Sequence, residues 1–112
     1  MDKRVQIVIA LIEADLRREI SLGDLAESVN LSASRLRHLF SAEVGMSPTQ
    51  YLKAIRIRKA KELLETTFMS VKQIMSVVGI GDRNHFAHDF KKAYGASPTE
   101  YRKLNFNAKV YR

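Results

Sequence analysis

The sequence contains no cysteine, no glycine-rich phosphate-binding loop and no apolar run long enough to span a membrane. Without cysteine the chain can form neither a disulfide framework nor a thiolate zinc site, and this fits a reducing compartment. The N-terminal apolar stretch, Val5 to Ile12, is short and is followed at once by acids and arginines. Neither a signal peptide nor a membrane span is therefore predicted, and we expect a cytoplasmic protein without a membrane partner.

Acidic residues are scarce relative to basic ones. The 112 residues include 19 Lys and Arg against 12 Asp and Glu, which gives a formal charge of +7 and a pI near 9.9. The excess is uneven, since residues 1–31 hold four basic and six acidic side chains whereas residues 32–112 hold fifteen and six. A basic excess of this kind favours a polyanionic partner, most simply nucleic acid.

The chain repeats itself with an offset of 50 residues. Residues 40–53 read FSAEVGMSPTQYLK and residues 90–103 read FKKAYGASPTEYRK, with Phe, Gly, Ser-Pro-Thr, Tyr and Lys in register. Upstream the offset falls to 49, which pairs Leu25 with Ile74 and places one extra residue of the second copy within residues 79–82. An insertion costs least in a turn between helices, so the repeat predicts two copies of a helix-turn-helix unit.

Strand signals are nearly absent and helix punctuation is dense, so an all-α fold of seven helices is predicted. Ser47 and Gln50 form a candidate capping box with Pro48 at the first helical position, and the same pattern recurs at Ser97-Pro98-Thr99-Glu100. Ser70 and Gln73 form a third candidate box. The expected helices are about Asp2–Arg18, Leu22–Val29, Ala33–Val44, Pro48–Glu65, Ser70–Val78, Asp82–Tyr94 and Pro98–Leu104. They predict a first helix-turn-helix sub-domain over 1–46, a long linking helix over 47–66, a second sub-domain over 67–106 and a tail over 107–112.

The third and sixth expected helices each carry a core face and a polar face. At 100° per residue, Leu36 and Phe40 share one face, as do Phe86 and Phe90 in the second copy, and these four residues are expected to be buried. The opposite faces carry Ser34, Arg37, His38 and Ser41 in the first copy, and Asn84, Ala87, His88 and Lys91 in the second. Short polar and basic side chains of this kind read base edges in a DNA major groove, although they also occur on a merely solvated surface.

A characteristic set of apolar, capping and basic residues extends over both helix-turn-helix motifs and the helix between them. It comprises Leu25-Ala26 and Val29-Asn30-Leu31-Ser32 in the first motif, Tyr51-Leu52, Arg56, Ala60 and Leu63-Leu64 in the bridge, and Ile74, Val78-Gly79-Ile80, Asp82, His85-Phe86, Phe90-Lys91-Lys92, Gly95 and Ser97-Pro98 to Tyr101-Arg102 in the second motif. With these residues, roughly residues 5–104 of the chain resemble the DNA-binding domain of the AraC/XylS family of bacterial transcription regulators, which has two helix-turn-helix motifs.

The chain departs from the family pattern at three places. Ile80 stands where the family usually has Phe, and Met75 stands where it favours Ala, so both changes affect core packing. Ala87-His88 stands where Ser-Arg is frequent. Because that pair faces the groove, base preferences of the family do not transfer to these two positions.

The resemblance implies a regulator whose two recognition helices enter major grooves of double-stranded DNA. Residues expected at base edges are Ser34, Arg37, His38, Arg83, Asn84 and His88, and those expected on the phosphate backbone are Arg35, Lys91, Lys92 and Arg102. A linking helix of about 18 residues would span about 27 Å, and a few ångströms added at each end bring this to the roughly 34 Å between successive grooves. One chain could then bind a long asymmetric site as a monomer, and RNA polymerase is expected as a further partner if the protein is an activator.

Other interpretations have less support. A helical protein-interaction module would carry apolar residues on the outer faces of the third and sixth helices, and these are missing. RNA binding lacks an exposed aromatic platform for unpaired bases. The basic run from Lys53 to Lys61 would suit a membrane-surface helix, but its apolar residues fit a bridge between two cores better. For Arg56 within that run, a structural ion pair is favoured over a DNA contact.

A metal site is the sharpest catalytic alternative. His85, His88 and Asp89 fall on one helix, but no further strong ligand lies nearby in the sequence. The first copy of the repeat has Arg35 in place of His85. The chain also has no Cys–His pair and no Ser/His/Asp order, so no metal, no cofactor and no enzymatic activity are expected.

Overall fold

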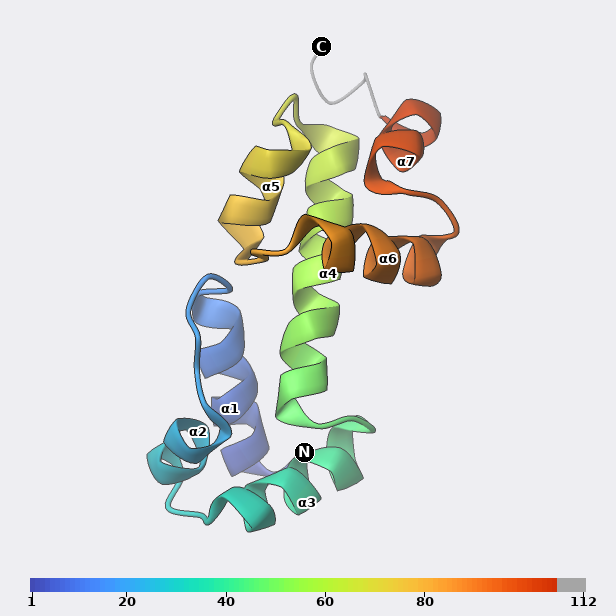
Figure 1. Cartoon of the computed structure of the whole chain (residues 1–112). Coiled ribbons are helices and arrows are strands. Elements are labelled where there is room, and N and C mark those ends of the chain that lie inside the picture. Colours follow the sequence, from blue (N-terminus) through green and yellow to red (C-terminus); the bar gives the residue numbers. More distant parts are fainter. Residues whose placement is uncertain (107–112) are drawn as a thin grey trace. The chain divides into compact units, whose positions relative to one another are not determined.

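The computed structural model describes residues 1–106, and its regular structure consists of seven helices (Figure 1). They are α1 Lys3–Ala14, α2 Leu22–Ser28, α3 Ala33–Val44, α4 Pro48–Thr66, α5 Val71–Val78, α6 Arg83–Tyr94 and α7 Pro98–Asn105. Residues 1–106 contain no strand, so the predicted all-α fold and its seven helices are confirmed for this part of the chain. The predicted tail over residues 107–112 lies outside the described residues.

The chain forms two compact units, of which the first is residues 1–55 and the second begins at Arg56. The division falls inside α4, which is a continuous helix from Pro48 to Thr66. The first unit therefore contains α1, α2, α3 and the first turns of α4. The second unit contains the later turns of α4 with α5, α6 and α7.

The core of the first unit is built from one apolar stripe on each of its first three helices. Leu36 and Phe40 of α3 are fully buried, as predicted. The ring of Phe40 meets Tyr51 of α4 edge to face, with 5.7 Å between the ring centroids. The buried residues of this cluster are Val5, Val8, Ile12, Leu25, Ala26, Val29, Leu36 and Phe40.

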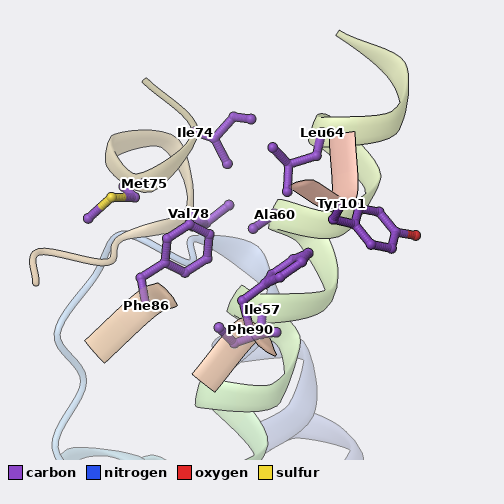
Figure 2. Packing of buried hydrophobic residues seen from close by; sticks show 9 residues of the cluster. All are labelled: Ile57, Ala60, Leu64, Ile74, Met75, Val78, Phe86, Phe90 and Tyr101. Carbon is purple, nitrogen blue, oxygen red and sulfur yellow. The ribbon is translucent and has the colours of Figure 1, made fainter. Parts of the chain in front are cut away.

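The core of the second unit is built from buried residues of α4, α5, α6 and α7 (Figure 2). Phe86 and Phe90 of α6 are buried, which confirms their prediction, and Phe90 meets Tyr101 of α7 edge to face at 5.3 Å. Met75 is buried and Ile80 packs against the cluster, so both family departures affect the core as expected. The buried residues are Ile57, Ala60, Leu64, Ile74, Met75, Val78, Phe86, Phe90 and Tyr101.

The internal repeat extends further toward the N-terminus than sequence identity indicates. The core positions Val5, Val8 and Ile12 of α1 correspond, at an offset of 52, to Ile57, Ala60 and Leu64 of α4. None of the three paired positions has the same residue in both sets, and their common property is burial at helical spacing. Each unit is therefore an opening helix, a helix-turn-helix pair and the start of a closing helix, and α4 closes the first unit and opens the second.

The two helix-turn-helix turns have matching backbone geometry. Asn30 adopts φ 58° and its counterpart Gly79 adopts φ 81°, the left-handed region in which Gly and Asn are the best-tolerated residues. The next amide in each turn bonds back to the preceding helix, Leu31 to Ala26 and Ile80 to Met75, both at 2.9 Å. The extra residue of the second copy is therefore Gly81, and it lies in the turn as predicted.

Local capping bonds explain where the later helices begin. The Ser47 and Gln50 box is complete, because the Ser47 amide donates to Gln50 Oε1 (2.9 Å) and the Gln50 amide donates to Ser47 Oγ (3.2 Å). Ser70 and Gln73 form the same reciprocal pair at the start of α5. These two predicted boxes are confirmed. At the third candidate, the Glu100 amide donates to Ser97 Oγ (3.3 Å), which is one of the two bonds of a box.

The first helix is shorter than predicted, because it ends at Ala14 and not near Arg18. Asp15 has an extended backbone, its Oδ1 accepts from the Arg17 amide (3.0 Å), and its carbonyl accepts from the Arg18 amide (3.2 Å). A short Asp side chain that bonds the backbone two residues on competes with helix continuation. Leu16, which falls inside the predicted range of this helix, consequently lies beyond the observed helix and is half-buried.

Candidate nucleic-acid interface

The first candidate reading element is α3. Its N-cap is Ser32, whose Oγ accepts from the Arg35 amide (3.2 Å). Because Leu36 and Phe40 are locked into the core, the rotation of the helix about its own axis is fixed. The three side chains predicted at base edges, Ser34, Arg37 and His38, are all exposed.

The second candidate reading element is α6, built on the same plan. Its N-cap is Asp82, whose Oδ1 accepts from the His85 amide (2.9 Å). This backbone bond is the main reason why the pKa of the Asp82 carboxyl lies below its usual value, so a negative charge is held at the start of the helix. The predicted base-edge residues are all exposed: Arg83, Asn84 and His88.

The two helices are equivalent in position but different in chemistry. At the offset of 50, Ser34 corresponds to Asn84, His38 to His88, and Arg37 to Ala87, which is half-buried. The first helix therefore carries its candidate purine-reading residue one turn later than the second. Such differences allow the two units to prefer different bases.

Three of the four predicted backbone-contact cations lie exposed on these same helices: Arg35, Lys91 and Lys92. Lys91 and Lys92 are in the last turn of α6, where a positive charge also favours the negative end of the helix dipole.

Arg102 lies in a different environment, because its guanidinium bonds within the protein. Nε donates to the Leu64 carbonyl (3.1 Å), and Nη2 donates to the Thr67 carbonyl (3.2 Å). The last carbonyls of a helix have no partner within it. Arg102 thus caps the C-terminal end of α4 from α7, and its side chain is half-buried.

Two Tyr–Glu hydrogen bonds tie the helix that follows each reading helix to the opening helix of its unit. The Tyr51 hydroxyl donates to Glu13 Oε1 at 2.6 Å in the first unit, and Tyr101 donates to Glu65 Oε2 in the second. Burial, and secondarily the bond to Glu65, raises the pKa of the Tyr101 hydroxyl above its usual value of 10.0. The internal repeat at an offset of 50 pairs Tyr51 with Tyr101 but does not pair Glu13 with Glu65. These two carboxylates correspond at the offset of 52 that relates α1 to α4.

Glu65 also holds a cation in the second unit. Lys61 Nζ lies 3.1 Å from Glu65 Oε2 and 5.6 Å from the centroid of the Tyr94 ring. The hydrogen bond to Glu65 is the main reason why the pKa of the Lys61 ammonium is raised. Lys61 is therefore part of a structural cluster and was not among the predicted contact residues.

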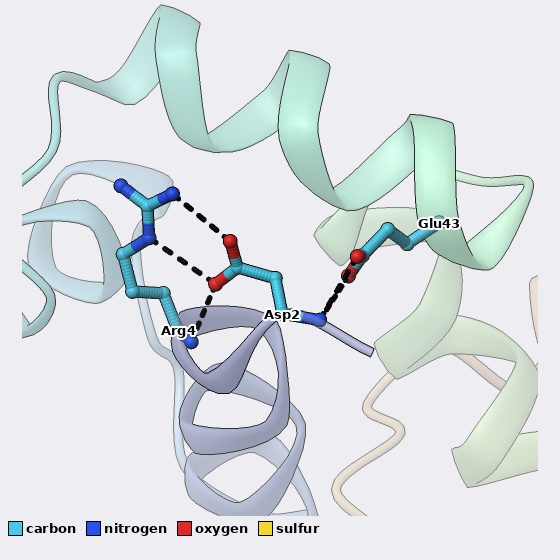
Figure 3. Close-up of polar contacts among 3 residues, drawn as sticks. All are labelled: Asp2, Arg4 and Glu43. Carbon is cyan, nitrogen blue, oxygen red and sulfur yellow. Dashed lines mark hydrogen bonds and ion pairs between the residues drawn. The ribbon is translucent and has the colours of Figure 1, made fainter.

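The C-terminal end of α3 is held by the N-terminus of α1 (Figure 3). The Asp2 amide donates to both carboxylate oxygens of Glu43, at 2.9 and 3.1 Å. The Asp2 carboxylate caps α1 by accepting from the Arg4 amide (2.7 Å) and also binds the Arg4 guanidinium (2.9 Å). These bonds, that to the guanidinium first, lower the pKa of Asp2 to about 2.

Two other kinds of site are absent from residues 1–106. No three His, Asp or Glu side chains of this part of the chain come together as a group that could hold a metal ion. None of its helices combines the length and the apolar character needed to cross a membrane.

Known proteins share this arrangement. The pattern of a family described as a helix-turn-helix domain matches residues 25–104. The arabinose operon regulatory protein of Escherichia coli is 39% identical over 103 residues, which cover 91% of this chain and 35% of that protein. Among similar curated regulators the chain spans between 27% and 37% of the relative's length.

Solved structures agree with the sequence relatives. The C-terminal domain of AraT, a response regulator from Geobacillus stearothermophilus, superposes with a TM-score of 0.87 at 30% identity, covering 96% of this chain and 90% of that one. The DNA-binding domain of AdpA, a global transcriptional factor solved in complex with a target DNA, has a TM-score of 0.83 at 26% identity, with 92% and 93% coverage. The chain therefore belongs to the AraC/XylS family of helix-turn-helix transcription regulators and corresponds to its DNA-binding domain.

Proposed function

We propose that α3 and α6 each enter a major groove of double-stranded DNA and read base edges there, so that one chain recognises a specific, asymmetric site. The observation that carries this proposal is that each helix, within its own unit, buries the same two positions of the repeat and exposes its predicted base-edge side chains. Leu36 and Phe40, like Phe86 and Phe90, are buried, and this turns every predicted base-edge side chain outward. Both outward faces are polar or basic, whereas a protein-interaction module would expose apolar side chains there.

Arg37 and Asn84 are the main specificity residues of this proposal. A guanidinium can donate two parallel hydrogen bonds to guanine O6 and N7, and a carboxamide can pair with adenine N6 and N7. Ser34, His38 and His88 do not present two parallel polar groups to one base edge, and they add less selective contacts. Arg83, in the first turn of α6, is the remaining base-edge candidate.

Arg35, Lys91 and Lys92 contact phosphates in this proposal and fix the register of the protein on the duplex. For Arg102 we propose a supporting role, because its guanidinium already donates to two carbonyls at the end of α4. It would hold α7 against α4 in the second unit.

Three further points complete the proposed function. Two reading helices in one chain make binding as a monomer sufficient for a site with two groove contacts. RNA polymerase is the expected protein partner if the regulator activates transcription. Binding to bacterial DNA would place the protein in the cytoplasm.

The test is selection of bound sequences from random duplex DNA with the purified chain, together with measurement of the mass of the complex. We expect two blocks of base preference about one helical turn apart, in a complex that holds one chain. Recovered sequences without a shared preference would contradict specific recognition. A single block would remove one of the two helices from the proposal, and two chains per site would contradict monomeric binding.

A further inference from the structure

The two units carry very different charge, although they share one fold. Residues 1–55 contain seven Lys and Arg and seven Asp and Glu, so the first unit is formally neutral. Residues 56–112 contain twelve Lys and Arg and five Asp and Glu, so the second unit holds the whole net charge of +7.

The asymmetry is already present in the helix-turn-helix pairs themselves. In the first pair, the charged residues of α2 are two exposed acids, Asp24 and Glu27. The charged residues of α3 are two arginines and one acid. In the second pair, α5 carries Lys72 and no acid, and α6 carries three cations and one acid. The formal charge of the pair is therefore −1 in the first unit and +3 in the second.

This difference falls where DNA phosphates would lie. In helix-turn-helix binding the first helix of each pair crosses the sugar-phosphate backbone while the second enters the groove. Exposed carboxylates on α2 would therefore oppose the phosphates, whereas Lys72 on α5 would attract them. Charges within about 10 Å of each other interact appreciably at ordinary salt concentrations.

We propose that the two units contribute unequally to DNA binding. This inference rests on the proposed function above. The second unit supplies most of the phosphate attraction and binds duplexes of any sequence. The first unit has little attraction for a non-cognate duplex, because Asp24 and Glu27 offset its arginines, and it adds affinity mainly when its base contacts are satisfied. The acids on α2 thereby lower non-specific binding and raise the ratio of specific to non-specific affinity.

The experiment measures how the affinity of the full chain for a non-cognate duplex depends on salt. Each phosphate contact contributes about 0.9 to the slope of log affinity against log salt. We compare Lys72→Gln/Lys91→Gln/Lys92→Gln in the second unit with Arg35→Gln/Arg37→Gln in the first. All five side chains are exposed, and circular dichroism checks that each variant is folded.

The slope lost for each cation removed is the deciding quantity. We expect it to approach 0.9 in the second unit and to be less than half of that in the first. Equal losses per cation in the two units would overturn the inference. If the unaltered chain bound duplexes without any salt dependence, the proposed function itself would fail, which is a different result.

A second variant tests the acids directly. Asp24→Asn/Glu27→Gln should raise affinity for a non-cognate duplex several-fold at low salt and by less at high salt, because salt screens the removed repulsion. Glu62→Gln in α4 is the matched control, since Glu62 is an exposed acid outside both helix-turn-helix pairs. An affinity gain no larger than that of the control would overturn the role assigned to α2.

Discussion

At the scale of single residues, some equivalent positions on the surfaces of α3 and α6 differ in chemistry, whereas the equivalent core positions of the two units are all apolar. Leu36 and Phe86 are both buried apolar residues, while Arg37 and Ala87 differ in size and charge. Packing restricts a buried position to residues of similar volume. An exposed position on a reading helix is free to change, so specificity is expected to reside there.

Arg37→Ala and Asn84→Ala should each relax base preference at one or two positions of the selected site. Loss of a bidentate pair removes about 1–3 kcal/mol of discrimination. Competition over single-base variants of the site measures this. Arg17→Ala, an exposed arginine outside the reading helices, should leave the preference pattern unchanged. If both variants lost affinity equally for every sequence, these side chains would contact the backbone and not the bases.

Tyr101 should titrate later than an ordinary tyrosine. Its pKa is raised by burial and by its hydrogen bond to Glu65, so its contribution to stability is complete below pH 10 and decreases as the pH rises through the raised value. The difference in ultraviolet absorbance titration between the unaltered chain and Tyr101→Phe isolates this hydroxyl. Its ionisation at pH 10 or below would contradict the buried hydrogen bond.

At the scale of helices, the ends are held by two kinds of contact. At the starts of α3, α5 and α6, the N-cap side chain accepts a hydrogen bond from the backbone amide three residues later. The end of α4 is instead capped by Arg102, which lies 38 residues after Leu64, and the end of α3 is held by Asp2 through Glu43. Local caps can be read from the sequence, whereas these distant caps require the chain to fold back on itself.

Arg102→Ala should lower the free energy of unfolding by about 1–3 kcal/mol, because two carbonyls near the end of α4 lose a charged donor. Lys103→Ala removes the same charge from an exposed neighbour and should change stability by less than about 0.5 kcal/mol. Denaturant unfolding measures both. The salt slope of DNA binding should be the same in the two variants. A slope lower by about 0.9 in Arg102→Ala alone would show a phosphate contact instead.

At the scale of the molecule, no residue belongs to both buried clusters. Leu36→Ala and Leu64→Ala should each cost about 2–5 kcal/mol, since both remove a fully buried side chain. Amide hydrogen exchange should show the main loss of protection in residues 1–55 for the first variant and from residue 56 onward for the second. Leu104→Ala, at an 80% exposed position, is the control. Equal loss throughout the chain for either core variant would contradict two separate cores.

The sequence by itself determined the helix order, most of the local N-terminal caps and the exposed polar faces of α3 and α6. These features depend on residues within about one turn of each other, such as Ser70 with Gln73 or Leu36 with Phe40. Because local backbone geometry fixes how such residues meet, their spacing in the sequence predicts the feature. The end of α1 was also local, but its Asp15 turn competed with an apolar stripe that continued to Leu16, and the stripe suggested too long a helix.

Only the tertiary structure decided how α4 is shared between two cores and which polar side chains support it. Ile57, Ala60 and Leu64 match Val5, Val8 and Ile12 by burial and not by identity, so their equivalence became visible only when both clusters were seen packed. Arg102 looked like any other cation beside Lys103 in the sequence. Its partners are backbone carbonyls, which every residue possesses, so no residue type marks them. The physical reason is that a side chain's role depends on what folding brings to it from far along the chain.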